Sequence, residues 1–148
     1  MRLIAPERLR APRAAPDRAW GPCTVCCTVM AVPALGKPGR RACDHLDDRG
    51  CGIHAERPGE CRAFNCLWLR GAVEGGDATR PDALGVMLDH FTHTADGTAH
   101  TLAFELWAGA LETPAARDVL DALCAERDVT VSYRDGRWST RSRRDDQV

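Results

Sequence analysis

Crowded cysteines are the feature that most limits what this chain can fold into. Seven of its eight cysteines lie between Cys23 and Cys66, and Cys124 stands alone downstream. The crowded part begins at "GPCTVCCTVM", which contains three cysteines within five positions, two of them adjacent. Thiols at this density are disulfide partners, packed small side chains, reactive thiols or metal ligands, and each alternative implies a different fold.

The N-terminal sequence argues against the disulfide alternative. Residues 1–20 contain arginines and prolines but no continuous apolar run, so they do not have the pattern of a secretory signal. No segment approaches the ~20 apolar residues needed to cross a bilayer. We therefore expect a cytoplasmic protein, and in a reducing cytosol thiols stay reduced unless a metal binds them.

Composition argues against some kinds of partner. The formal net charge of −1 gives no electrostatic reason to expect nucleic acid or an anionic membrane, so we predict neither. A protein partner stays unknown. Apolar residues make up 44% of the 148 positions, enough for a packed core. Residues 1–18 are rich in proline, alanine and arginine and residues 141–148 are charged, so we expect a flexible N-terminal arm and a charged tail.

The spacing of the cysteines is typical of thiolate metal sites. Cys23 and Cys26 are separated by two residues, a spacing common in zinc sites. Prolines and glycines leave room only for short helices, the best of which is the pattern over residues 57–71. We predict that residues 19–72 form a loop-rich segment that binds a metal ion. Its candidate ligands are Cys23, Cys26, Cys27, Cys43, Cys51, Cys61 and Cys66, with His45 and His54 as further candidates.

The adjacent pair Cys26 and Cys27 leaves two interpretations open. Neighbouring side chains diverge, so either one thiol binds the metal while the other packs or reacts, or the two face different centres. One zinc ion or one four-iron cluster uses four thiolates, so the surplus cysteines would form a second site, tune the first or pack. His45 and His54 are either imidazole ligands or loop histidines that hydrogen-bond to the backbone.

The ordered pattern resembles the YkgJ-like cysteine-cluster family, which is described as a zinc- or iron-chelating domain. The stretches "CTVCC", "KPGRRACDHL" and "GCGIHAERPGECRAFNCLWL" carry the resemblance, across about residues 20–72. The family starts with Cys-x2-Cys-x2-Cys-Cys and finishes with Arg-Pro-x-x-Cys-Arg-x-Phe-x-Cys. The finish matches the residues from Arg57 to Cys66. The first cysteine of the start would fall at Trp20, and His54 stands where many members have tyrosine.

The resemblance implies metal binding, by zinc or by an iron–sulfur cluster. Flagellin lysine methylases contain a related cysteine domain and are linked to iron–sulfur chemistry, so an iron–sulfur enzyme or redox protein is one alternative function. A thiol-based metal or redox sensor is another. The sequence contains no glycine-rich methyl-donor loop and no recognisable catalytic set, so whether the chain is an enzyme stays open and catalytic residues stay unknown.

Two arginines flank Cys61 in this segment. We predict that Arg57 and Arg62 bind at the centre by offsetting thiolate charge and by hydrogen-bonding to sulfur. The alternative is that each pairs with a surface carboxylate, such as Glu56 or Glu60.

Beyond a loop at residues 73–81, the pattern over residues 82–140 changes. Strand patterns at 83–94 and 100–109 flank Asp96-Gly97, which suits a tight hairpin. A helix is predicted from Thr113, and a second hairpin turns at Asp135-Gly136. We predict an α+β fold in which a small antiparallel sheet (β-β-α-β-β) with one packed helix follows the cysteine segment. Cys124, in the apolar stripe of that helix, is predicted to be a packed thiol.

Three histidines lie near the first predicted hairpin. Counting outward from the turn places His93 opposite His100, and alternation places His90 on the other face of the sheet. We interpret them as an exposed polar pair and a separate third histidine rather than as a metal site.

Overall fold

The computed structural model describes residues 3–10, 13–19, 21, 23–48, 50–93 and 95–143, without the side chains of residues 54, 60 and 62. The fold is mixed α+β. The helices are α1 (Val25–Val29), α2 (Gly59–Ala63), α3 (Pro81–Leu84) and α4 (Pro114–Cys124), with short 3-10 helices at Pro6–Arg8, Pro33–Leu35, His54–Glu56, Gly76–Thr79 and Ala110–Glu112. The strands are β1 (Leu46–Asp47), β2 (Gly50–Cys51), β3 (Val86–Thr92), β4 (Ala99–Glu105), β5 (Val129–Ser132) and β6 (Trp138–Arg141).

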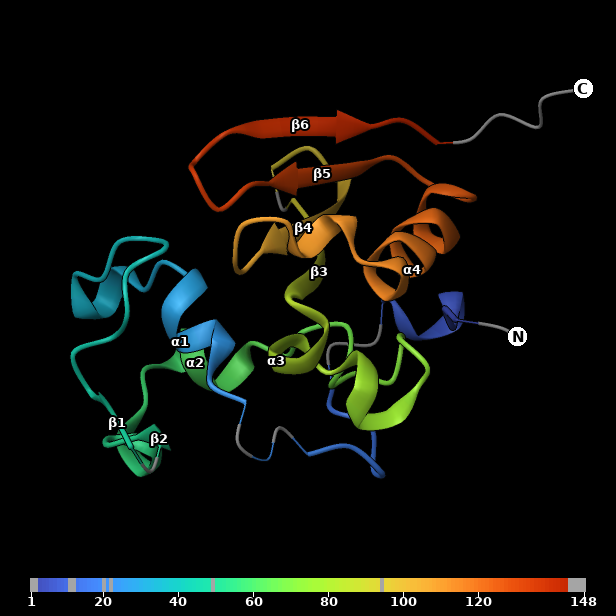
Figure 1. Cartoon of the computed structure of the whole chain (residues 1–148). Helices are drawn as coiled ribbons and strands as arrows, with labels where there is room; N and C mark the ends of the chain where they lie inside the picture. The colour runs from blue at the N-terminus through green and yellow to red at the C-terminus, as the bar shows by residue number, and fades with distance from the viewer. Residues whose placement is uncertain are drawn as a thin grey trace, which may run out of the picture.

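The larger sheet has four strands in the order β3-β4-β5-β6, and its central pairing departs from the sequence prediction. β3 pairs with β4, and β5 with β6, in antiparallel fashion, but β4 and β5 run parallel. The prediction of a purely antiparallel sheet is therefore wrong at this pair. The chain leaves β4, passes through α4 beside the sheet and returns in the same direction (Figure 1), and such a helical crossover connects parallel strands.

The hydrophobic core lies where this sheet meets α4. Val131 of β5 is fully buried, as are Leu120 and Leu123 of α4. The helix begins as the sequence predicts: Pro114 occupies its first turn, and the Thr113 hydroxyl accepts a hydrogen bond from the Ala116 N–H at 3.3 Å. Cys124 is buried in the same core, which confirms its interpretation as a packed thiol.

The N-terminal arm does not behave as expected, because much of it packs against the core. Leu9 is 1% exposed, and Ile4 and Ala15 are also buried. The Ala15 N–H donates to the Leu69 carbonyl at 2.8 Å. Arg18 donates to the carbonyl oxygens of Trp68 and Val73, and its guanidinium lies over the Trp68 ring. The described residues of the arm are therefore packed rather than loosely attached, because Ile4 and Leu9 join the core that the segment from Leu67 to Val73 also enters.

The predicted helix over residues 57–71 is also much shorter than its pattern suggested. α2 ends at Ala63, and the chain then turns so that Leu67 and Trp68 enter the core. Arg70 holds this turn by donating to the Asn65 carbonyl at 2.7 Å. Burial of two large apolar side chains outweighs the few hydrogen bonds that a longer helix would add.

The first hairpin has a different register from the one predicted. His100 pairs with Phe91, and their rings stack with centroids 5.2 Å apart, so the pairing of His93 with His100 is wrong. The His93 N–H donates to the Thr98 carbonyl at 2.7 Å, so the chain turns over more residues than Asp96 and Gly97 alone, and the Asp96 carboxylate accepts hydrogen bonds from the N–H and hydroxyl of Thr98. The second hairpin turns at the predicted place, closed by a bond from the Tyr133 N–H to the Arg137 carbonyl.

The tail is described only as far as residue 143, and β6 extends into it to Arg141. Residues 144–148 of the predicted charged tail lie outside the described part of the chain.

Candidate metal centre

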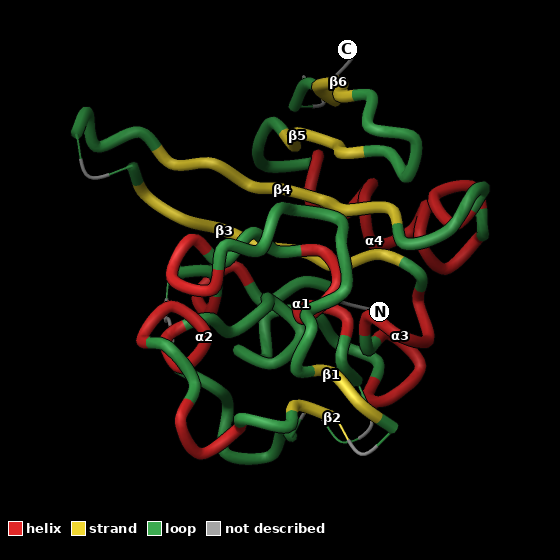
Figure 2. Tube along the Cα trace, turned by 90° about the vertical axis from the view of Figure 1, so that its left-hand side faces the viewer, coloured by secondary structure: helices red, strands yellow, loops and turns green. Residues whose placement is uncertain are grey.

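The cysteine segment forms a separate layer beside the sheet. The two-residue strands β1 and β2 lie at the end of the molecule opposite β6 in both views (Figures 1 and 2). α1 carries Cys26 and Cys27, β2 ends at Cys51, and α2 carries Cys61. The Cys43 N–H donates to the Cys27 carbonyl at 2.9 Å, so the loop before β1 is attached directly to α1. Short elements joined in this way gather cysteines from distant positions.

Electrostatic effects between thiols describe two overlapping groups. Cys61 is acted on by Cys27, Cys43 and Cys51, and we call these cysteines the four-thiol group. Cys26 is acted on by Cys23 and Cys66, as well as by its neighbour Cys27, and Cys66 is acted on by Cys23. We call Cys23, Cys26 and Cys66 the three-thiol group. All seven predicted ligands therefore lie within electrostatic reach of another cysteine.

The adjacent pair joins the two groups through a hydrogen bond between its thiols. This bond lowers the pKa of Cys27 and raises the pKa of Cys26, so Cys27 holds the thiolate and Cys26 the proton. The cations of Lys37 and Arg57 also lower the pKa of Cys27, against the opposing effect of its partial burial. The thiol that carries the charge is thus the one beside the cations.

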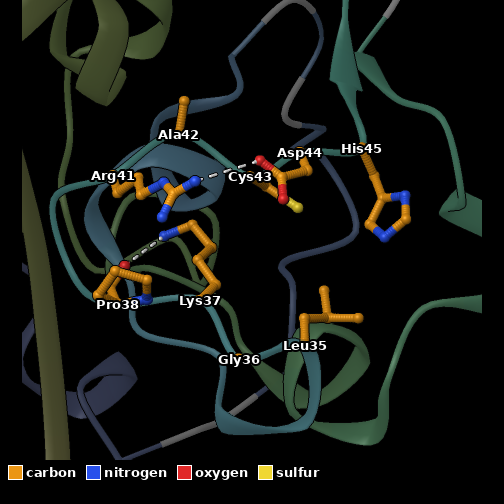
Figure 3. A pocket seen from close by; sticks show the side chains of 9 residues that line it. All are labelled: Leu35, Gly36, Lys37, Pro38, Arg41, Ala42, Cys43, Asp44 and His45. Atoms are coloured by element: carbon orange, nitrogen blue, oxygen red, sulfur yellow. Dashed lines mark hydrogen bonds and ion pairs between the residues drawn. The ribbon is translucent and has the colours of Figure 1, made fainter.

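Lys37 is a functional candidate that the sequence analysis missed. It is the only lysine in the chain and is 7% exposed. Its ammonium donates to the carbonyl oxygens of Met30 and Pro38, and a hollow beside it is lined by Cys43 and His45 (Figure 3). Burial lowers the pKa of Lys37, whereas the neighbouring thiolates, Cys43 foremost, raise it. A lone lysine among arginines was the signal available in the sequence.

The structure describes the side chains of only some of the other polar residues predicted for the site. Arg57 donates to the Cys61 carbonyl oxygen at 3.5 Å, and its charge acts to lower the pKa of both Cys27 and Cys61. His45 is exposed, and its backbone carbonyl accepts a hydrogen bond from the Gly52 N–H. The side chains of His54 and Arg62 lie outside what the structure describes.

Backbone amides interact with two sulfurs of the three-thiol group. The N–H groups of Val25 and Asp82 donate to Cys23, and those of Trp68 and Leu69 donate to Cys66. Burial raises the pKa of Cys66 to about 11, and these hydrogen bonds act in the opposite direction.

Arg40 attaches the cysteine segment to the sheet. Its N–H donates to the Val29 carbonyl at the end of α1. Its guanidinium donates to the carbonyl oxygens of Glu105 and Ser132, each at 2.8 Å, and to the Ser132 hydroxyl. Among the described residues, Arg40 is the one non-glycine residue whose backbone is left-handed, with a φ of 59°. One residue therefore links α1 to the ends of β4 and β5.

The ligand atoms do not converge on a single point as they stand. Within the described ranges, no three cysteine, histidine or carboxylate side chains are close enough together to hold an ion. The chemistry of the donor set nevertheless fits a metal: soft thiolates, N–H donors to sulfur and nearby cations. Binding of an ion would require the loops to bring these sulfurs closer together.

The histidines near the first hairpin are separated by the sheet. His90 is buried, and its Nδ1 lies 2.9 Å from the Thr101 hydroxyl oxygen, whereas His93 and His100 are exposed. His90 is therefore a core residue, separate from the two exposed histidines, and the three form no metal site within the described part of the chain.

Comparison with known proteins leaves the site to be judged on its own geometry. No protein-family model, no curated protein and no solved structure matches the chain. None of the helices in the described residues combines the length and the hydropathy needed to span a bilayer.

Proposed function

We propose that this chain is a metal-binding protein, and that Cys27, Cys43, Cys51 and Cys61 together hold a zinc ion or an iron–sulfur cluster. The observation that carries the proposal is that Cys61 of α2 is acted on by the charges of three other partly buried thiols, those of Cys27 in α1, Cys43 in the loop before β1 and Cys51 at the end of β2. Four thiolates complete the ligand set of either group. This is also what the resemblance to the YkgJ-like family implies.

The charge around the four-thiol group supports the same proposal. Four thiolates leave a net negative charge even around a divalent cation. Lys37 and Arg57 both act on Cys27 and would offset that charge, and Lys37 is also acted on by Cys43 and Cys61. A buried ammonium held by carbonyl oxygens is fixed in place for this role.

The poor hydrophobic packing of the segment is a second argument. The buried apolar side chains among the described residues from 23 to 66 are Val29 and Val32. Strands of two residues and helices of five cannot stabilise themselves. A bound metal would supply the missing folding free energy. The sheet and α4, in their β-β-α-β-β order, would then serve as the scaffold to which this segment attaches.

The test is element-specific metal analysis of the whole chain, purified once with and once without oxygen. A colourless protein holding zinc supports the single-ion centre. A brown anaerobic sample with a broad visible absorption supports a cluster, and with it the alternative of an iron–sulfur redox protein. Cys43→Ser and Cys51→Ser should each abolish stoichiometric binding, whereas the control Cys124→Ala should retain it. If neither metal is found under either condition, the proposal is wrong.

A further inference from the structure

The described chain covers one edge of the larger sheet and leaves the other open. At the β3 edge, the Leu67 N–H donates to the Leu88 carbonyl at 2.9 Å, and the Arg70 guanidinium donates to the His90 carbonyl at 3.0 Å. At the opposite edge, β6 pairs with β5 on one side, and no described strand pairs with it on the other. β6 lies at the outer limit of the molecule in both views (Figures 1 and 2). An uncovered edge of this kind is a template for an added strand.

The pairing of β6 with β5 shows which of its backbone groups face the open edge. At the turn between them, the Tyr133 N–H donates to the Arg137 carbonyl at 2.8 Å. In an antiparallel ladder, hydrogen-bonded pairs alternate with non-bonded pairs, so the next bonded residue of β6 is Ser139. The N–H and C=O groups of Trp138 and Thr140 therefore point away from β5, toward the open edge.

The two faces of β6 carry different side chains. Trp138 is 59% exposed, and its ring meets the Phe104 ring of β4 edge-on, with the centroids 6.3 Å apart. Alternation places Arg137 and Arg141 on the opposite face, where the Arg137 guanidinium lies over the Tyr133 ring. A strand added at this edge would meet an indole on one face and guanidinium groups on the other.

The charge of the edge selects the kind of strand that it would accept. Residues 133–143 contain four arginines and one aspartate, although the net charge of the whole chain is −1. The aspartate, Asp135, pairs with Arg137 at 2.7 Å, but the Arg137 side chain stays 72% exposed. Pairing of two copies through β6 would place arginine-rich strands side by side, and like charges across a ladder are destabilising. An acidic strand is favoured instead.

We propose that the open edge of β6 binds an extended acidic segment of a partner protein, which adds a fifth strand to the sheet. The backbone of that segment bonds to Trp138 and Thr140. Apolar side chains on one face of the segment pack on the Trp138 ring, and acidic side chains on its other face pair with Arg137 and Arg141. A nucleic acid would match the charge but has no peptide groups to continue the ladder. The inference does not depend on the proposed metal centre.

The test is a titration of the whole chain with a labelled peptide of alternating glutamate and valine, followed by fluorescence anisotropy. We expect saturable binding that slows amide hydrogen exchange at Trp138 and Thr140, measured by NMR. A peptide of alternating lysine and valine is the charge control and should not bind.

Backbone methylation of the peptide separates edge pairing from simple charge attraction. In one peptide the valine nitrogens are methylated, and in the other the glutamate nitrogens. Only one of these sets faces β6, because alternate N–H groups of a strand point in opposite directions. Methylation of that set should weaken binding about tenfold, and methylation of the other set should leave it unchanged.

Substitutions in the chain locate the binding surface. Thr140→Pro removes an N–H that faces the open edge, a position where a strand tolerates proline, so this variant should fold and bind more weakly. Trp138→Ala and Arg141→Glu should also weaken binding of the acidic peptide. Arg13→Glu, at an exposed position of the N-terminal arm, is the charge-matched control and should bind as the wild type does. If Thr140→Pro fails to fold, the methylated peptides make the same test on the wild type.

Three results would overturn the inference. Equal binding of the two methylated peptides and the unmodified one would exclude pairing at the edge. Binding of single-stranded oligothymidine without binding of the acidic peptide would assign the surface to nucleic acid. A concentration-dependent dimer in sedimentation that Thr140→Pro abolishes would assign it to a second copy of the chain. Failure of the proposed metal centre is seen separately, as absence of bound metal.

Discussion

The cysteine segment and the sheet with α4 differ in the kind of side chain that each region buries. In the sheet, strands of up to seven residues pack Val129, Val131 and Ala103 against α4 with no exposed surface. In the described part of the segment from 23 to 66, the buried side chains include few apolar groups and one ammonium, that of Lys37. The hydrophobic effect is enough to explain the first region and not the second. The comparison teaches that a segment with so few buried apolar side chains needs another source of folding free energy, which the proposed metal would supply.

Removal of metal should separate the two regions most strongly. Structural zinc contributes on the order of 10 kcal/mol in small domains that depend on it. After treatment with a chelator, we expect amide hydrogen exchange to become fast in residues 23–66 and to stay slow in β4 and β5. Equal loss of protection in both regions would show that the sheet also depends on the metal.

Shortening a side chain of the core should destabilise the sheet and α4 but leave metal binding by the cysteine segment unchanged. Leu120 is 1% exposed within the core, so Leu120→Ala should lower the free energy of unfolding by about 2–5 kcal/mol. Urea unfolding measures this, with the exposed Asp118→Ala of the same helix as control. At urea concentrations too low to unfold the variant, the number of metal ions bound per chain should be unchanged. Loss of metal in the folded variant would contradict the separation of the two regions.

Substitutions of Arg40 test whether its hydrogen bonds hold the cysteine segment to the sheet. Arg40→Ala removes charge-assisted hydrogen bonds to two strand ends and should lower the free energy of unfolding by about 1.5–3 kcal/mol. Arg40→Gly loses the same bonds but adopts the left-handed backbone readily, so it should be more stable than the alanine variant by about 1 kcal/mol. Urea unfolding of the pair isolates the side-chain contribution. Equal stability of both variants with the wild type would mean that Arg40 links nothing.

The smallest effect concerns pH and the sheet alone. Burial lowers the pKa of His90, and the cations of Arg127, Arg70 and Arg10 lower it further. The folded state therefore prefers neutral His90, so its contribution to stability is complete above the unfolded pKa of about 6.5 and is lost as the pH falls through that value.

The measurement for His90 is the difference in the free energy of urea unfolding between pH 8 and pH 5. Replacing His90 with Gln should reduce this difference by about 1 kcal/mol, because the titrating group is gone. Comparison with the wild type cancels the protonation of the cysteines, and the exposed His93→Gln serves as control. An unchanged difference in His90→Gln would contradict the prediction.

Local sequence signals predicted the elements that depend on neighbouring residues. The helix start at Thr113 and the turn at Asp135-Gly136 follow from capping and turn chemistry within a few positions. Where the determining partner is distant, the same reasoning failed, as it did for the arm around Leu9 and the helix that ends at Ala63.

The candidate site was predicted by residue type but not by arrangement. Spacing alone selected the seven cysteines as candidate ligands, because so many thiols in one short segment call for a common explanation. It gave no reason to divide them, and it overlooked Lys37 and Arg40, whose roles depend on carbonyl oxygens that only the folded chain brings near.

The sequence by itself determined the mixed α+β composition of the chain and the crowding of its thiols, since both follow from residues close together along the chain. Only the tertiary structure decided that β4 and β5 run parallel, that the arm packs into the core, and that Cys26 and Cys27 lie between two different groups. The physical reason is the same in each case. Burial and charge act across space, and the residues that meet in this way are many positions apart.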